Sequence, residues 1–145
     1  MEGANAVEAA LDTGRVRELF YVADAGSREL ALVDRAVAAG TAVTAMTERA
    51  AAALGDTVTP PGLVAVCGLV DVAFESVTAA RLVAVPVEVG EPGNAGTIIR
   101  VADAMGADAV VLAGDSVDPH NGKCVRASAG SLFHLPIVRE RDAHA

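Results

Sequence analysis

Hydrophobic residues in the first seventy positions alternate between the spacing of amphipathic helices and that of buried strands. Glycines 14, 40 and 55 follow the three helical segments, where helices commonly end, and Thr47 stands where an N-cap is expected. The pattern predicts helices at 4–11, 28–39 and 47–54, and strands at 18–24, 42–46 and 63–70. This alternation predicts an α/β domain with a largely parallel sheet.

The pattern weakens around residues 71–80 and then restarts. We therefore predict two domains, at residues 1–72 and 80–145. In the second we expect strands at 81–89, 107–114 and 137–140, helices at 97–105 and 124–135, a turn at 91–96 and a loop at 115–123. Pro86 inside the first strand indicates an edge position or a bulge. The order β-α-β-α-β is half of a doubly wound sheet, in which ligands bind at the carboxyl ends of the strands.

Of the 145 residues, 52% are hydrophobic, much of this content is alanine and valine, and only three Phe, one Tyr and no Trp are present. The composition therefore predicts a packed core of small aliphatic side chains with few aromatic ones. The net charge of −8 disfavours a nucleic-acid partner, although a local basic patch can exist on an acidic chain. The absence of a signal peptide or long apolar segment makes the cytoplasm the expected location.

Cysteines and histidines give no pattern typical of a metal site. Cys67 and Cys124 are distant and are expected to be reduced thiols. His120, His134 and His144 each lack a second ligand at a helical or hairpin spacing, so no metal is expected.

Two segments carry candidate chemistry, and the first spans residues 91–100. Its glycines 93 and 96 would let the backbone approach a ligand, yet the segment contains neither G-x-G-x-x-G nor a phosphate-loop ending. A nucleotide-binding turn and an ordinary strand-to-helix connection both remain possible. Arg100 is either directed at a ligand or paired on the surface with Glu91 or Asp103.

The second segment spans residues 118–131. Lys123 and Arg126 place positive charge beside a polar loop, which suits phosphate or carboxylate. The alternative is a plain turn, with Ser128 and Ser131 as small residues between packed helices.

A hydrolase built from Ser128 or Ser131 with His134 and Asp118 is disfavoured. The sequence has no G-x-S-x-G motif, and Ser131 and His134 lie on one predicted helix without an evident oxyanion hole.

Together, the two segments resemble the first half of the catalytic domain of the SpoU/TrmH (SPOUT) RNA ribose 2′-O-methyltransferases. The stretches concerned are PGNAGTIIRVADAMGADAVVL and DPHNGKCVRASAGSLFHLP. The family motif N-x-G-x-x-x-R falls on Asn94, Gly96 and Arg100, and R-A-S-x-G falls on residues 126–130. Residues 2–22 are similar to the start of the family's ribosomal-protein-like substrate-binding domain. The resemblance is strongest to the ribosomal RNA branch that includes thiostrepton-resistance enzymes.

The resemblance implies methyl transfer from S-adenosylmethionine to a ribose 2′-hydroxyl of RNA, with 23S ribosomal RNA as the expected substrate. It makes Arg100 the residue that orients and helps to activate the hydroxyl, and Asn94 the residue that shapes the loop holding it. Because an arginine pKa exceeds about 12, we expect positioning and electrostatic stabilisation by Arg100, not proton removal. The residues expected to contact RNA or to brace the site are Asn121, Lys123, Arg126 and Ser128.

The resemblance also implies an incomplete fold. In the family, further motifs tie a trefoil knot that supplies most of the methyl-donor pocket and much of the dimer interface. We therefore expect an α/β substrate-binding domain followed by a parallel-sheet SPOUT domain that lacks the knot. No cofactor-binding residue is expected in this chain, which should be inactive alone, and its dimerisation is left open. An RNA-binding module and a non-catalytic remnant are the alternatives.

Overall fold

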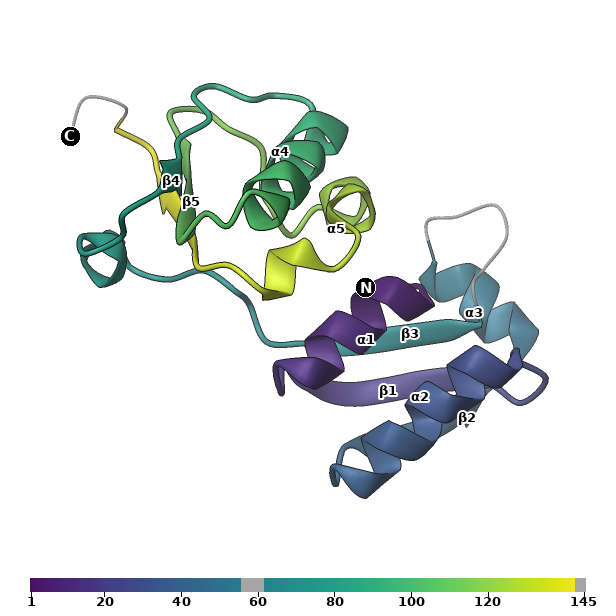
Figure 1. Cartoon of the computed structure of the whole chain (residues 1–145). Coiled ribbons are helices and arrows are strands. Elements are labelled where there is room, and N and C mark those ends of the chain that lie inside the picture. The colour runs from purple at the N-terminus through teal and green to yellow at the C-terminus, as the bar shows by residue number, and fades with distance from the viewer. Residues whose placement is uncertain (56–61, 143–145) are drawn as a thin grey trace. The chain divides into compact units, whose positions relative to one another are not determined.

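The computed structural model describes residues 1–55 and 62–142, and the chain divides into two compact units, Met1–Gly68 and Leu69–Ala145 (Figure 1). The segment 69–77 belongs to the second unit, since Val72 N–H donates to Ile137 O at 2.9 Å.

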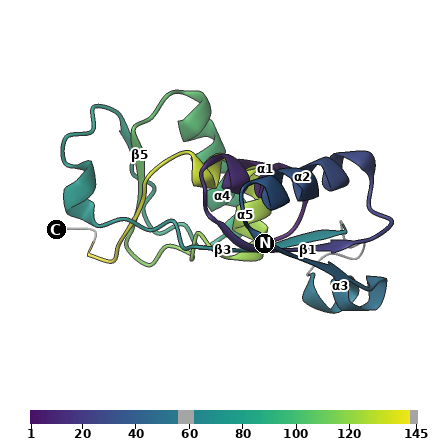
Figure 2. The same cartoon turned by 90° about the horizontal axis from the view of Figure 1, so that it is seen from below.

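The first unit is a three-stranded sheet with helices on both faces (Figures 1 and 2). Helices α1 and α2 lie on one face and α3 on the other (Figure 2). Its elements are α1 Ala4–Asp12, β1 Val16–Val22, α2 Ser27–Ala38, β2 Ala42–Met46, α3 Glu48–Leu54 and β3 Leu63–Cys67. The α/β class is confirmed. The sheet is mixed, however: β1 pairs with β2 in parallel and with β3 antiparallel. The order of helices and strands along the chain does not determine whether β3 runs parallel or antiparallel to β1.

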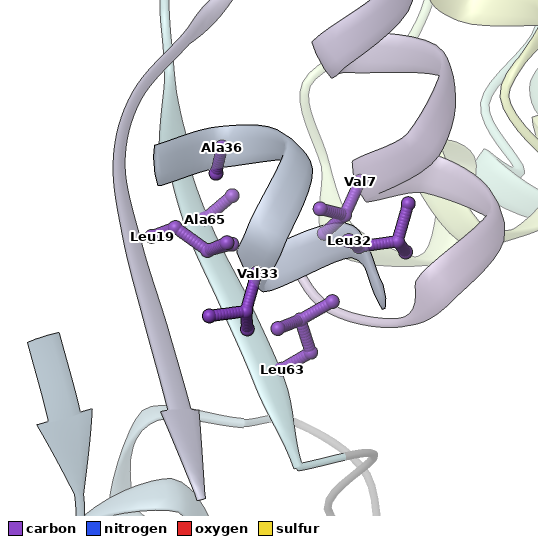
Figure 3. Close-up of a cluster of buried hydrophobic side chains, with 7 residues drawn as sticks. All are labelled: Val7, Leu19, Leu32, Val33, Ala36, Leu63 and Ala65. Atoms are coloured by element: carbon purple, nitrogen blue, oxygen red, sulfur yellow. The ribbon is translucent and has the colours of Figure 1, made fainter. Parts of the chain in front are cut away.

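The core of the first unit consists of small aliphatic side chains, as the composition predicts (Figure 3). Its buried members are Val7, Leu19, Leu32, Val33, Ala36, Leu63 and Ala65. The N-cap prediction for α3 is also confirmed, because Thr47 Oγ1 accepts from the N–H of Ala50 at 3.2 Å.

The second unit has the predicted parallel sheet, and its strands lie in the order β4-β5-β6. The described elements are the 3₁₀ turn Phe74–Val77, β4 Val83–Ala84, α4 Pro92–Ala104, β5 Ala109–Ala113, α5 Gly122–Ser128, the 3₁₀ turn Ser131–Phe133 and β6 Ile137–Glu140. The central strand β5 is buried along its whole length. The predicted strand at 81–89 was too long, because continuous pairing ends before Pro86 and resumes only as a bridge between Val87 and Ala113. The edge position predicted from Pro86 is confirmed.

Two helix boundaries differ from the sequence prediction. Helix α4 begins at Pro92, so most of the predicted turn at 91–96 is helical. Proline is suited to a first helical position, and the Glu91 carboxylate caps the helix by accepting from Gly93 N–H at 3.2 Å. The predicted helix 124–135 instead ends at Ser128, because Ala129 and Gly130 adopt left-handed conformations with φ of 51° and 101°.

The close approach of α4 to α5 depends on Gly96. A Cβ at this position would lie 2.4 Å from Cys124 O, 2.7 Å from Ala127 Cβ and 2.9 Å from Ser128 N. Two of these atoms belong to the backbone of α5, which cannot move aside as a flexible side chain can. The two helices can therefore approach this closely only because residue 96 has no side chain.

Gly96→Ala should lower the free energy of unfolding by about 2 kcal/mol or more, because the added methyl group overpacks a backbone contact. Urea denaturation followed by circular dichroism measures the change.

Gly93→Ala is the matched control on the same helix. Its Cβ would meet only Glu91 Oε1 at 3.4 Å and Lys123 Cε at 3.5 Å, both in flexible side chains. We expect a change within about 1 kcal/mol. Equal effects of the two substitutions would contradict the assigned role of Gly96.

Candidate functional site

The residues predicted to act form two groups, at 94–100 and at 121–128. The contact between α4 and α5 brings the two groups together. Asn94 and Arg100 belong to α4, whereas Asn121 caps α5 and Lys123, Arg126 and Ser128 belong to it. Figure 1 shows the two helices beside each other in the second unit. All six lie on these helices or at the cap, although their exposure differs.

Arg100 is exposed, and no described residue forms an ion pair or side-chain hydrogen bond with it. The two acids considered as its surface partners have other partners. Glu91 pairs with Lys123 Nζ at 2.5 Å, and Asp103 pairs with His134 Nδ1 at 2.8 Å. The Arg100 guanidinium is thus available to an anion from outside the described chain.

Arg100 and Asn94 project from different sides of α4. Gly93, Gly96 and Arg100 follow one helical stripe, at spacings of three and four, and the two glycines contact α5. Asn94 is exposed in the first turn and is displaced from Arg100 by about 120° around the axis. Arg100 therefore continues the α5-facing stripe, whereas Asn94 projects from another side of the helix start.

The residues of α5 divide into exposed and buried groups. Asn121 Oδ1 accepts from the N–H of Lys123 at 2.9 Å and so caps the helix. Lys123 and Arg126 are exposed. The Lys123 ammonium, with a further hydrogen bond from Gly93 N–H, holds the pKa of Glu91 below its usual value. Ser128 is fully buried, and its Oγ donates to Val125 O at 2.8 Å. Burial suits Ser128 to bracing the site.

The loop before α5 is fixed by a polar network that the sequence did not reveal. His120 Nδ1 lies 3.0 Å from Asp118 Oδ1, and Val70 N–H donates to His120 Nε2 at 3.3 Å. Arg139 reaches Asp118 at 3.6 Å and Asp71 at 3.9 Å. These residues come from three separate segments, so only the fold shows that they act on one loop.

The pKa of Asp118 reflects this network. Partial burial alone would raise it, but the hydrogen bonds from the backbone and ring of His120, together with Arg139, hold it below its usual value. The carboxylate therefore stays ionised and keeps the loop pinned.

The hydrolase arrangement is not formed. Asp118 contacts His120, whereas His134 contacts Asp103, and Ser131 is buried. Among residues 1–55 and 62–142, no three His, Cys, Asp or Glu side chains gather as metal ligands, and His144 lies outside these ranges.

Neither cysteine is prepared for nucleophilic chemistry. Burial, helped by the nearby Asp118, raises the pKa of Cys124 to about 11, and burial also raises the pKa of Cys67. Both thiols therefore remain protonated at neutral pH.

The carboxyl edge of β5 and β6 contains a cavity of only about 40 Å³. Its lining includes Gly114, Ser116, Arg139 and Glu140. Sites for small molecules usually measure about 300–1,000 Å³. This cavity is too small for a nucleoside-sized ligand. A second cavity of about 390 Å³ lies within that range, and its lining, which includes Phe74, Val83, Val111 and Glu140, is mainly apolar.

Comparison with known proteins identifies the class of this α/β chain. Residues 1–71 match the family described as RNA 2′-O ribose methyltransferase substrate binding, and residues 81–145 match the SpoU rRNA methylase family. The two matches account for nearly the whole sequence, so the chain belongs to the SpoU methyltransferase family.

Relatives and solved structures agree with this assignment. The chain is 37% identical over 140 residues to the Bacillus subtilis 23S rRNA (guanosine(2553)-2′-O)-methyltransferase RlmP, covering 96% of this chain and 53% of that protein. It superimposes with a TM-score of 0.82 and 31% identity on the SpoU methyltransferase AviRb from Streptomyces viridochromogenes in complex with AdoMet, covering 99% of this chain and 54% of that one. For the AdoMet-bound rRNA methyltransferase from Sinorhizobium meliloti, the TM-score is 0.80 at 31% identity, with 97% and 53% covered.

The chain spans about half the length of the relatives that it matches. None of the described helices has the length and apolar character needed to cross a membrane.

Asp103→Asn should destabilise the chain by about 1 kcal/mol at neutral pH, because it weakens the contact between α4 and the turn that follows α5. Partial burial would raise the pKa of Asp103, but hydrogen bonds from Ser131 and His134 hold it below its usual 3.8. The carboxylate therefore contributes its full stability above pH 3.8, and the contribution disappears as the pH falls through the folded-state pKa.

Thermal melts of wild type and Asp103→Asn between pH 7 and pH 3 measure this contribution. The difference in melting temperature should shrink toward the acidic end. Asp115→Asn, at an exposed position of the same unit, is the control and should show little difference throughout. A constant difference for Asp103→Asn would contradict an electrostatic origin.

Proposed function

We propose that this chain supplies the RNA-binding and hydroxyl-orienting part of an S-adenosylmethionine-dependent ribose 2′-O-methyltransferase acting on 23S ribosomal RNA. The observation that carries the proposal is Arg100. It is the motif arginine of a SpoU chain, it is exposed at the α4–α5 edge, and no described acid neutralises it.

The role proposed for Arg100 follows from its charge. A ribose hydroxyl is a poor nucleophile until its proton departs, and the developing negative charge on oxygen needs a cation nearby. A guanidinium offers fixed N–H donors, stays charged, and can hold a phosphate and a hydroxyl in defined positions. Arg100 would therefore orient the hydroxyl and stabilise its charge, while Asn94 would shape the start of the same helix.

The residues of α5 would hold the RNA backbone against this edge. Lys123 and Arg126 are exposed cations, and Asn121 sets the start of their helix. Ser128 would act from inside by fixing the last turn. On a chain of net charge −8, such local cations must carry the phosphate contacts. An rRNA substrate also supports the cytoplasm as the place of action.

The polar cavity at the carboxyl edge of β5 and β6, about 40 Å³, is too small for the methyl donor. The larger cavity of about 390 Å³ beside β4 and β5 is lined mainly by aliphatic side chains such as Val83, Val85 and Val111, which offer few hydrogen-bonding groups to a nucleoside. When bound, S-adenosylmethionine supplies the methyl group. We assign no residue of the described ranges to it, and propose that the 145-residue polypeptide is inactive alone. The same observation favours a second candidate, a non-catalytic RNA-binding module.

Substitution of the α4–α5 cations should weaken RNA binding. For Arg100→Ala and Arg126→Ala we expect affinity for a 23S rRNA fragment to fall about threefold to tenfold, with a shallower salt dependence because fewer counterions are released. Fluorescence anisotropy over a series of salt concentrations measures both quantities.

Arg81→Ala is the matched control, because Arg81 is exposed beside the amino end of β4 and belongs to neither α4 nor α5. Its affinity and salt slope should match wild type. A loss equal to that of Arg100→Ala would show that binding responds only to net charge.

A chimera separates the catalytic proposal from the binding-module alternative. Residues 1–140 of this chain, continued by the remaining part of the Bacillus subtilis relative, should transfer labelled methyl from S-adenosylmethionine to 23S rRNA. The Arg100→Lys chimera should lose activity by about a hundredfold or more, because an ammonium lacks the planar set of donors. An active Lys chimera would contradict the role of Arg100. A folded chimera that binds RNA and donor without transfer would favour the binding module.

Calorimetric titration of the 145-residue polypeptide with S-adenosylmethionine tests the remaining part of the proposal. We expect no binding at micromolar donor concentrations. Micromolar affinity would show that the chain forms a donor pocket on its own.

A further inference from the structure

The edges of the two sheets are protected unequally. In the first unit the outer edge of β3 is closed by the start of the chain: Ala65 N–H donates to Met1 O at 2.9 Å, and Gly3 N–H donates to Leu63 O at 3.2 Å. In the second unit Asp71 and Val72 pair beside Ile137 of β6. Strand β4 has only two residues. Each of these three edges is thus covered or too short to recruit another strand.

The outer edge of β2 has no such protection. It is the edge strand beside β1, and no residue among 1–55 and 62–68 pairs with its other side. Residues 41–46 contain no charged residue, proline or glycine, the usual means of preventing strand pairing. Ala42, Thr44 and Ala45 are exposed along it. Five consecutive uncharged residues therefore present an open row of backbone donors and acceptors.

An apolar flank of α2 adjoins this open edge. Arg28 and Arg35, on one side of α2, pair with Glu8 and Asp12 of α1. Exposed Leu30 and Val37, 37% and 60% accessible, lie on the opposite side of α2 by helical spacing.

Helix α1 contacts β3 whereas α2 contacts β2, so the side of α2 away from α1 faces outward over the β2 edge. The two exposed aliphatic side chains and the unpaired strand edge therefore form one continuous surface, which we call the β2–α2 edge.

We propose that the β2–α2 edge binds a second copy of this chain through antiparallel pairing of the two β2 strands about a two-fold axis at Thr44. In this register Thr44 faces Thr44 of the second copy, Ala42 faces Met46, and Val43 faces Ala45. The pairing would extend each three-stranded sheet into one of six strands. This proposal is independent of RNA binding and methyl transfer.

Charge and geometry favour a second copy as the occupant. The nearest charged residue beyond the strand, Glu48, would lie opposite Gly40, so no like charges oppose each other along the strands. The two α2 helices, each lying over β1 and β2, would be separated by two strand spacings, about 9.6 Å. Helices pack at about 8–10 Å, so Leu30 and Val37 of both copies would meet across the axis.

The test measures mass by light scattering and by sedimentation equilibrium on the full chain. Wild type should approach twice 14.6 kDa at micromolar concentrations. Thr44→Lys and Thr44→Glu should each weaken association about tenfold or more, because like charges would meet on the axis. An equimolar mixture of the two variants should dimerise again, since lysine then faces glutamate. This recovery also shows that both variants remain folded.

A second pair of variants tests the helical part of the surface. Val37→Lys should weaken association, whereas Ala38→Lys, which adds the same charge on the neighbouring solvent-facing position, should not. A monomeric wild type would overturn the proposal. So would Thr44→Lys and Thr44→Glu variants that stay dimeric, or that fail to associate when mixed.

Discussion

The contact between α4 and α5 at Gly96 is the constraint on which the candidate site depends. The carbonyl of Cys124 and the amide nitrogen of Ser128 come so close to position 96 that no side-chain atom fits. This distance decides where Arg100 emerges, because it follows Gly96 by one helical turn on the same stripe. It also determines the burial of Ser128 and Cys124, which lie under the contact. Gly96 of the motif therefore has a packing role, and the packing that it permits places Arg100 at the surface.

Around this contact, polar side chains fix the ends of the helices. Glu91 and Asn121 cap α4 and α5, and the pair between Glu91 and Lys123 joins the two beginnings. At the other end of α4, Asp103 joins the helix to His134. Glu91 and Asp103, the two acids considered as partners of Arg100, are therefore engaged elsewhere. On an acidic chain this division of partners leaves Arg100 without a counter-ion among the described residues, so its charge is available to an external anion.

The edge strands of the two sheets are covered to different extents. The parallel sheet of the second unit has a fully buried central strand, and its edges are either very short or covered by residues 71–72. The mixed sheet of the first unit is closed on one side by the chain start and remains open along β2. Because backbone groups at an open edge retain their hydrogen-bonding capacity, the first unit has a surface suited to association. That surface belongs to the first unit, whereas the cations of α4 and α5 belong to the second.

Within residues 1–55 and 62–142, the sequence by itself determined the α/β class, the approximate positions of the strands and of most helices, the cap at Thr47 and the edge position indicated by Pro86. These features depend on local periodicity and on residues with restricted backbones, which act within a few positions. It also selected the six candidate residues of α4 and α5, through motif resemblance. Only the tertiary structure decided that α4 starts at Pro92, that α5 ends before Ala129, that β3 runs antiparallel, and that Glu91 and Asp103 bond to Lys123 and His134. These features depend on contacts between segments that are distant in the sequence, and a local sequence pattern does not contain that information.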